Sequence, residues 1–232
     1  MKKIFILLLT CVLAFAFAAC APQQPAGDQP DDGAITAVEE RQVYDLKEMG
    51  AGNSTFAVTG ITLQGDSAAV QAINESVSRD IDRILKDTAD DDAVLYGGDT
   101  AGAISHELAY QLVYSDDELI SLRADGYDEA EGAAHGMSYT RGYVYNAVSG
   151  ERIGLGELVG DDYVAKITDY IVTCVRASGE EANYFPDYRS SIAPVLETED
   201  CWYVAEDGIH IFFAPYTLAA NAFGVLEFVY AY

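Results

Sequence analysis

A strict alternation of residue types over 104–114 is the feature that most constrains the fold. Ile104, His106, Leu108, Tyr110, Leu112 and Tyr114 alternate with mostly polar residues. A period of two is typical of a strand with one buried face. The turn residues 115–117 and the apolar segment 119–124 come next, so the sequence predicts a hairpin here.

Two segments have helical periodicity instead. In the first, which Asp66 or Ser67 can cap, apolar residues recur at spacings of three and four as far as Leu85. The second, capped by Asp161 or Asp162, has an apolar stripe over 163–175. Residues 87–102 are acidic and glycine-rich, and we expect a loop there.

Further strands are expected at 55–63, 137–145, 202–205, 209–213 and 224–230. Strand runs separated by two isolated helices predict an α+β fold, a mostly antiparallel sheet with two main helices packed on it. The expected core includes Ile73, Val77, Ile81, Ile167, Ile171, Trp202, Ile211 and Phe213.

The N-terminus has the features of a bacterial lipoprotein leader. Lys2 and Lys3 precede an apolar run over 4–17, and small residues then lead to Cys20. The run is too short for a permanent membrane span, which needs about 20 residues. We therefore predict a signal peptide at 1–19, lipidation of Cys20, and anchoring to the cell membrane on its extracytoplasmic face. An ordinary signal peptide and an uncleaved anchor helix are the alternatives.

The residues after the leader are expected to divide into a tether and one domain. Residues 20–40 contain a stretch rich in Pro, Gln, Gly and Asp, which is typical of a flexible segment. Residues 41–232 are then the extracytoplasmic domain. Its two cysteines, Cys174 and Cys201, would lie where disulfides persist. Sequence spacing leaves open whether they are bridged or remain thiols.

The charge limits the partners. The chain has 38 Asp and Glu residues against 13 Lys and Arg, a formal net charge of -25. Nucleic acid is excluded as a partner, because phosphate binding needs clustered basic residues. A cationic protein would be attracted. Alternatively, the charge serves solubility alone.

Catalytic and metal-binding motifs are absent from the sequence. It has no nucleophile elbow, zinc-protease helix or phosphate loop, so we predict neither an enzyme nor a bound cofactor. The three histidines, His106, His135 and His210, lack the spacing of a metal site. We expect His106 at the core or its rim and His210 at the surface or an edge. The acidic runs 90–92 and 116–118 do not have calcium-loop spacing and are expected to be solvated.

The segment 125–136 is the best candidate for a binding surface. It is expected to be a loop of small and acidic residues around one histidine, with glycines that permit positive φ and close backbone approach. The hypothesised ligand-binding residues combine acids with an aromatic anchor: Asp125, Tyr127, Asp128, Glu129, Glu131 and His135.

Short turn motifs in a fixed order suggest a family. Gly132 to His135 resembles a glycine-glycine-alanine-histidine loop, with Ala133 in place of the second glycine. Residues 146–152 resemble its asparagine turn, with Glu151 inserted before the basic residue, and 207–216 its ending of aspartate-glycine, apolar strand and proline-tyrosine. Over about residues 50 to 230 the chain resembles the extracytoplasmic domain of the anti-sigma factor RsiV and the non-catalytic domain of the peptidoglycan deacetylase PdaC.

The resemblance implies a binding role. In the anti-sigma factor such a domain binds lysozyme, and in the deacetylase it accompanies a separate catalytic domain. We therefore expect a non-enzymatic envelope module for a cationic protein such as lysozyme, or for peptidoglycan. One alternative is a wall-modifying hydrolase that uses His135 as a base beside Asp128 or Glu131. The other is a structural lipoprotein without a specific ligand.

Overall fold

The computed structural model describes residues 35–96 and 103–231. The predicted signal peptide, Cys20 and the greater part of the predicted tether lie outside these residues, so they remain predictions. Residues from Ala34 onward form one compact unit. In the described part of the chain, no helix combines the length and the apolar character needed to cross a membrane.

The larger of two sheets has five strands in the order β1-β2-β3-β4-β5. All neighbouring pairs are antiparallel except β2 and β3, which are parallel and joined through the long helix α1. The elements are β1 (Ala37–Asp45), β2 (Thr55–Leu63), α1 (Ala68–Tyr96), β3 (Ile104–Ser115), β4 (Leu119–Ala130) and β5 (Met137–Asn146).

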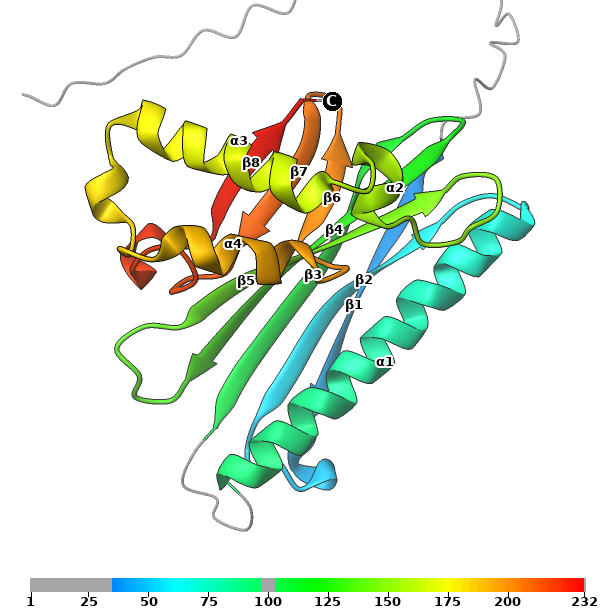
Figure 1. The fold of residues 1–232 in the computed structure, drawn as a ribbon. Helices are drawn as coiled ribbons and strands as arrows, with labels where there is room; N and C mark the ends of the chain where they lie inside the picture. The colour runs from blue at the N-terminus through cyan, green and yellow to red at the C-terminus, as the bar shows by residue number, and fades with distance from the viewer. Residues whose placement is uncertain (1–34, 97–102, 232) are drawn as a thin grey trace, which may run out of the picture. The chain divides into compact units, whose positions relative to one another are not determined.

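The smaller sheet is antiparallel, in the order β6-β7-β8, and the remaining helices lie around it (Figure 1). Its strands are β6 (Trp202–Ala205), β7 (Gly208–Phe213) and β8 (Leu226–Tyr230). The helices are α2 (Leu155–Val159), α3 (Tyr163–Ser178) and α4 (Tyr188–Leu196). Three short 3₁₀ segments, Leu46–Met49, Glu181–Asn183 and Asn221–Phe223, complete the described part.

Two hydrophobic cores follow from this arrangement. The first lies between α1 and one face of the large sheet, where Ile73, Val77 and Leu108 are buried. The second lies among α3, α4 and the small sheet, where Ile171 and Trp202 are buried. Strand β5 contributes to both cores, because its alternate side chains point to opposite faces.

The predicted α+β class with a mostly antiparallel arrangement is confirmed. The expectation that both main helices pack on one sheet is wrong in detail. Each helix covers its own sheet, α1 the large one and α3 the small one (Figure 1). The predicted core residues are buried, apart from Ile81, which is partly buried.

Helix α1 extends eleven residues past its predicted end at Leu85, so the acidic segment 87–96 is helical and not a loop. The inward face continues through Ala89, which is fully buried, and then through Asp92, which is 2% exposed. Asp92 interrupts the apolar stripe because its carboxylate contacts His106 within the fold. The predicted cap at the start of α1 is confirmed, since the Ser67 hydroxyl accepts from the backbone N–H of Val70 at 3.1 Å.

Strand β4 continues to Ala130, so the predicted loop 125–136 is mostly strand. Its first half pairs with β3 on one side and β5 on the other, and only 131–136 connects β4 to β5. Strand β1 was not predicted, and it begins at Ala37, inside the range expected for the tether. It is an edge strand with charged, mostly exposed residues, so its sequence lacks the apolar-polar alternation by which a half-buried strand is predicted.

Gly142 joins the two sheets. A Cβ at this position would overlap the carbonyl oxygen of Trp202, so only glycine permits the approach of β6 to β5. The backbone N–H of Gly142 donates to the carbonyl of Asp200 at 2.9 Å, and the Ser121 hydroxyl accepts from the N–H of Val204 at the same distance. These contacts set the small sheet on one end of the large one.

Candidate functional site

Strand alternation divides the predicted binding residues between two faces of the large sheet. Asp128 is opposite His106 in the register and lies on the face that α1 covers. Asp125, Tyr127 and Glu129 alternate with it and therefore lie on the opposite face, here called the outer face. The structure thus places Asp125, Tyr127, Asp128 and Glu129 in one strand and puts Glu131 and His135 in the connection after it. It does not bring all six residues to one surface.

Two of the four predicted acids are engaged within the fold. The Asp125 carboxylate accepts from Arg123 Nε at 2.9 Å and from the Thr140 hydroxyl at 2.8 Å. Asp128 Oδ1 lies 2.8 Å from Nδ1 of His106. Both carboxylates therefore have partners inside the fold, and Asp128 lies on the other face from Asp125 and Glu129, so the four acids do not form one continuous surface.

The remaining residues form a row at the end of the outer face. Tyr127 is 38% exposed, and Glu129 and Glu131 are also exposed. Within residues 35–96 and 103–231, neither glutamate side chain makes a hydrogen bond or an ion pair. The row continues the strand geometry past Ala130, because the Glu131 N–H donates to the Ala103 carbonyl at 2.9 Å.

A hollow of about 340 Å³ lies beside this row. Its polar lining includes Asn53, Thr55, Ser105 and the two glutamates. Residues 103–104 and 130–133 complete the lining, and Gly132 adopts φ +78° in the turn. An open hollow with free carboxylates suits a cationic group, which would gain charge-assisted hydrogen bonds there.

Tyr127 has a defined place in this surface because of Gly136. A Cβ at Gly136 would overlap the Tyr127 ring and approach the Asp128 carbonyl to 2.6 Å. The tyrosine therefore lies across the glycine backbone with part of its ring exposed. The predicted role of these glycines in close backbone approach is confirmed, and the same relation holds on the other face between Gly126 and Tyr139.

His135 lies in the connection after β4 and is exposed. Its Nδ1 lies 3.1 Å from the carbonyl oxygen of Gly136 and 3.2 Å from Nδ2 of Asn221. No carboxylate in the described part of the chain contacts this ring. The hydrolase alternative named Asp128 and Glu131 as examples of an acid beside His135, and neither of them contacts its ring.

His106 occupies a different environment, between two carboxylates. Its Nδ1 lies 2.8 Å from Asp128 and its Nε2 lies 3.0 Å from Asp92, and the histidine is 7% exposed. A neutral imidazole donates from one nitrogen only, so two carboxylate acceptors favour the imidazolium form. Burial alone lowers the pKa of His106, but the bonds to Asp128 and Asp92 outweigh it, so the pKa is raised above 6.5. The expectation of a core or rim histidine is confirmed.

His210 is also held between two acids, but at the small sheet. Its Nδ1 lies 2.8 Å from Glu227 and its Nε2 lies 2.7 Å from Asp207. The ring stacks on Tyr203 with centroids 4.7 Å apart, and Arg123 from β4 donates to the Tyr203 hydroxyl at 3.0 Å. This polar cluster connects the small sheet to the outer face of the large one.

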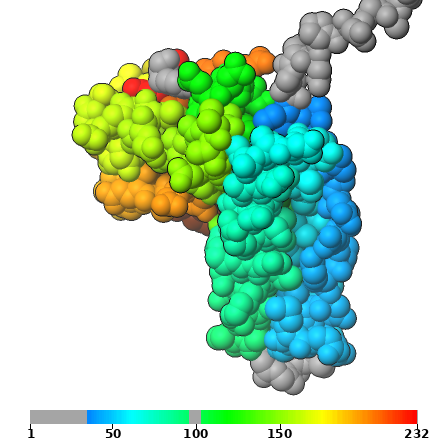
Figure 2. All heavy atoms as spheres, turned by 90° about the vertical axis from the view of Figure 1, so that its right-hand side faces the viewer, coloured from blue at the N-terminus to red at the C-terminus, as the bar shows by residue number. Residues whose placement is uncertain are grey.

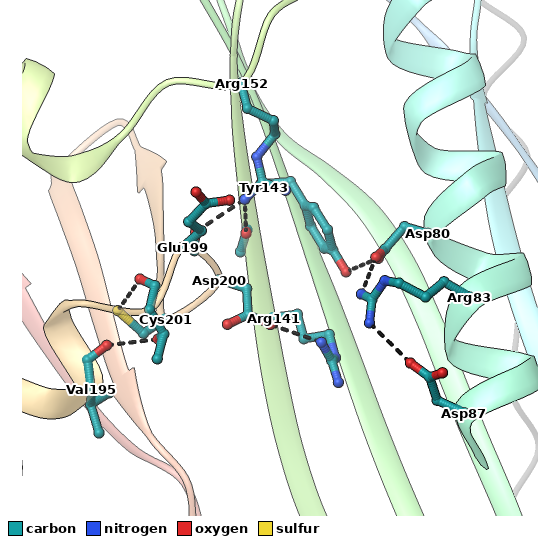
Figure 3. A network of polar contacts seen from close by, with 12 residues as sticks. Asp80, Arg83, Asp87, Arg141, Tyr143, Arg152, Val195, Glu199, Asp200 and Cys201 are labelled. Carbon is teal, nitrogen blue, oxygen red and sulfur yellow. Dashed lines mark hydrogen bonds and ion pairs between the residues drawn. The ribbon is translucent and has the colours of Figure 1, made fainter. Parts of the chain in front are cut away.

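A further polar network lies between α1 and β5, and Figure 3 shows Tyr143 pointing from the sheet toward Asp80 on the helix. Asp80 accepts from Tyr143, from Arg83, and from Tyr110 at 2.9 Å. Burial raises the pKa of Asp80, but bonds from Tyr143, Arg83 and Tyr110 hold it below 3.8. The network attaches the middle of α1 to the sheet, and the Asp80 carboxylate is occupied by these three bonds.

The two cysteines are free thiols in the structure. Cys174 is partly buried on α3, whereas Cys201 is 4% exposed and donates to the carbonyl of Thr198 at 3.5 Å. Burial raises the pKa of the Cys201 thiol to about 11, so it remains protonated and unreactive at neutral pH. The sequence left open whether Cys174 and Cys201 form a disulfide, and in this structure they do not.

Among the described residues, no group of three or more His, Cys, Asp and Glu has the geometry of a metal site. The candidate site consists of the exposed residues Tyr127, Glu129 and Glu131 with the adjoining hollow, and we call it the tip surface. Thr55 and Ser105 were not predicted as site residues, because their place beside Glu129 depends on strand register. The alternation of residue types places Ser105 on the polar face of its strand. It does not show that Thr55 and Glu129 lie beside it on the neighbouring strands.

Comparison with known proteins gives a family match for part of the chain and similar folds among solved structures. Residues 157–230 match the family model described as protein of unknown function (DUF3298). A search of curated proteins finds no match.

Two solved structures are similar in fold. A crystal structure of a DUF3298 family member from Bacteroides fragilis NCTC 9343 has a TM-score of 0.58 at 15% identity, covering 86% of this chain and 90% of its own. A DUF3298 family protein from Pseudomonas aeruginosa PAO1 has a TM-score of 0.54 at 12% identity, covering 84% and 89%. At these identities the likeness shows a shared fold.

Proposed function

We propose that this chain is a non-enzymatic binding module of the cell envelope that recognises a cationic protein through its tip surface. The observation that carries the proposal is the pair of exposed, unpaired carboxylates of Glu129 and Glu131 beside an exposed tyrosine and a hollow. The leader and Cys20 support attachment to the outer side of a membrane.

The distribution of charge supports a cationic partner. Most arginines and lysines of the described chain already contact acids or backbone carbonyls, as Arg41 does with Glu107 and Arg141 with Asp200. The acids outnumber the bases by 38 to 13, so many carboxylates face solvent without an internal partner. Such a surface steers a cationic protein toward it and raises the association rate.

The tip surface supplies what charge alone does not. Affinity at protein interfaces depends on a few anchors, and aromatic residues are enriched among them. Tyr127 is held in place by its contact with Gly136, so little ordering of its side chain would be needed on binding. The two glutamates would accept hydrogen bonds from lysine or arginine side chains of the partner.

The choice of partner comes from the sequence motifs. The DUF3298 match over 157–230 carries no described activity. The sequence motifs that resemble the RsiV and PdaC domains favour a lysozyme-like protein as the partner, with peptidoglycan as the second candidate. The loop histidine of those motifs corresponds to His135, which contacts no acid within the described residues.

Association kinetics with a cationic lysozyme would test the proposal, using the full-length protein in zwitterionic detergent. The wild type is expected to associate more slowly as salt increases, since screening acts over about 8 Å at physiological ionic strength. The variant Glu129→Gln/Glu131→Gln should associate more slowly at low salt and respond less to salt. Tyr127→Ala should dissociate faster with little change in association.

The matched control is Asp117→Asn/Glu118→Gln, which changes the charge equally at the turn before β4, the other end of the same strand. It should retain most of the wild-type association rate. Absence of lysozyme binding at low salt would remove lysozyme-type proteins as ligands. Equal rates for both double variants would show that the tip surface is not the contact.

A further inference from the structure

A second depression lies on the opposite face of the large sheet, between the edge strand β1 and helix α1. It is a groove of about 280 Å³. Figure 2 shows the two elements that form it, with α1 in cyan to green beside the blue β1–β2 segment. The groove belongs to neither the tip surface nor the His106 and His210 clusters.

The groove exists because α1 does not cover the edge of the sheet. The Asn74 side chain fixes α1 to the end of β2, accepting from the Leu63 N–H at 2.8 Å and donating to its carbonyl at 2.9 Å. At the floor of the groove, Gly60 has no side chain, and a Cβ there would reach only Ile81 Cδ1 at 3.4 Å and the Glu40 carbonyl at 3.9 Å. Space therefore remains between helix and strand.

The lining combines an apolar floor with polar walls. Val58 and Val77 are buried at 2% and 1% exposure, and Ile81 is partly buried beside them. The strand β1 contributes one wall, where alternate residues Glu40, Gln42 and Tyr44 face the helix. The helix contributes the other wall, which includes Ser78 and Asp82.

The two acids of the groove are exposed and uncompensated. Neither Glu40 nor Asp82 makes a hydrogen bond or an ion pair within the described chain. The nearest arginines along the chain are engaged elsewhere, Arg41 with Glu107 and Arg83 with Asp80 and Asp87. An acid on each wall above an apolar floor is complementary to a group with an aliphatic stem and a cationic end.

We infer that this groove binds a lysine or arginine side chain presented by a partner protein. The methylene groups would lie against Val58, Val77 and Ile81, and the charged end would lie between Glu40 and Asp82. Long basic side chains bury their stems on apolar surface while the charge remains near water. The inference does not depend on the tip surface, because the groove lies on the other face and uses other residues.

Tetralysine titration tests the inference on the full-length protein in zwitterionic detergent, observed by NMR of methyl groups. The Val58, Val77 and Ile81 methyl signals should shift together and saturate. Glu40→Gln/Asp82→Asn should weaken tetralysine binding about tenfold, which corresponds to about 1.4 kcal/mol. Gly60→Ala should also weaken binding, because its methyl group fills the floor without a change in charge.

The control Asp117→Asn/Glu118→Gln removes the same charge far from the groove and should change the tetralysine affinity less than about twofold. Unchanged affinity in the Glu40/Asp82 variant would overturn the inference. So would shifts spread evenly over acidic surfaces without saturation at the groove methyl groups. Loss of lysozyme binding at the tip surface, with groove binding retained, would overturn the proposed function and leave this inference standing.

Discussion

The Nε2 atom of His106 lies 3.0 Å from Oδ2 of Asp92, a carboxylate whose side chain is 3% exposed near the end of α1. The contact explains how an acid occupies a buried, inward position near the end of the helix, next to the apolar residues Ile84 and Ala89. It also connects the end of α1 to β3, and through Asp128 to β4. The helix, the sheet and the strand that supports the tip surface therefore meet at one imidazole ring.

Removal of the Asp92 carboxylate should destabilise the protein. Asp92→Ala would leave the buried Nε2–H of His106 without its acceptor, at a cost of about 1–3 kcal/mol in the free energy of unfolding. The control is Asp91→Ala, since Asp91 is exposed on the same helical turn and should change stability by less than about 0.5 kcal/mol. Urea denaturation compares the two, and equal stabilities would show that the His106–Asp92 contact contributes nothing.

The sequence predicted the parts of the fold that follow from local periodicity. The alternation over 104–114 became β3, and the stripe from Val70 to Ile84 became the inward face of α1. It could not predict that Asp92 is buried, because the partner that makes burial tolerable, His106, is brought to it by tertiary packing. An acidic run with no visible partner is indistinguishable from a solvated one.

The candidate site was predicted in its composition but not in its geometry. Tyr127, Glu129 and Glu131 were predicted as residues of one loop, and a loop assignment gives no rule for which side chains share a surface. Once 125–130 is a strand, the period of two sends Asp128 to the opposite face. Glycines and acids lowered the expectation of a strand there, and pairing on both sides overrides that local preference.

Stability should depend on pH through His106. Because the pKa of His106 is raised above 6.5 in the fold, the stability contributed by its bonds to Asp92 and Asp128 is fully present below pH 6.5. That contribution is lost as the pH rises through the folded pKa. The ring protons of His106 should titrate in NMR with a midpoint above 6.5. A midpoint below 6.5 would mean that burial outweighs the bonds to Asp128 and Asp92.

A methyl group at Gly142 should separate the two sheets. Gly142→Ala places its Cβ against the backbone carbonyl of Trp202, which is unable to move without shifting β6. We expect a loss of about 3 kcal/mol or more in the free energy of unfolding. Gly60→Ala is the matched control, because its Cβ meets only ordinary contacts, and its stability in the same urea titration should remain close to wild type. Near-wild-type stability of Gly142→Ala would show that β6 moves aside easily.

Membrane attachment should depend on Cys20. Cys20→Ala removes the thiol that would accept the lipid, so the protein should be released from the membrane or remain as an uncleaved precursor. Detergent phase partitioning of cells expressing the wild type and the variant measures this. Partition of a cleaved Cys20→Ala protein into the detergent phase would exclude the lipoprotein assignment.

The shared strand β5 has a consequence for how the molecule divides. Tyr143 and Tyr145 belong to the core beneath α1, whereas the intervening Val144 belongs to the core of the small sheet. The family match begins at residue 157, after this strand, although the core that contains the matched segment also includes Leu119 and Val144. A fragment that starts there would lose one wall of its own interior. The start of the family match at residue 157 is therefore not a domain boundary. We expect the two cores to unfold together in one cooperative transition.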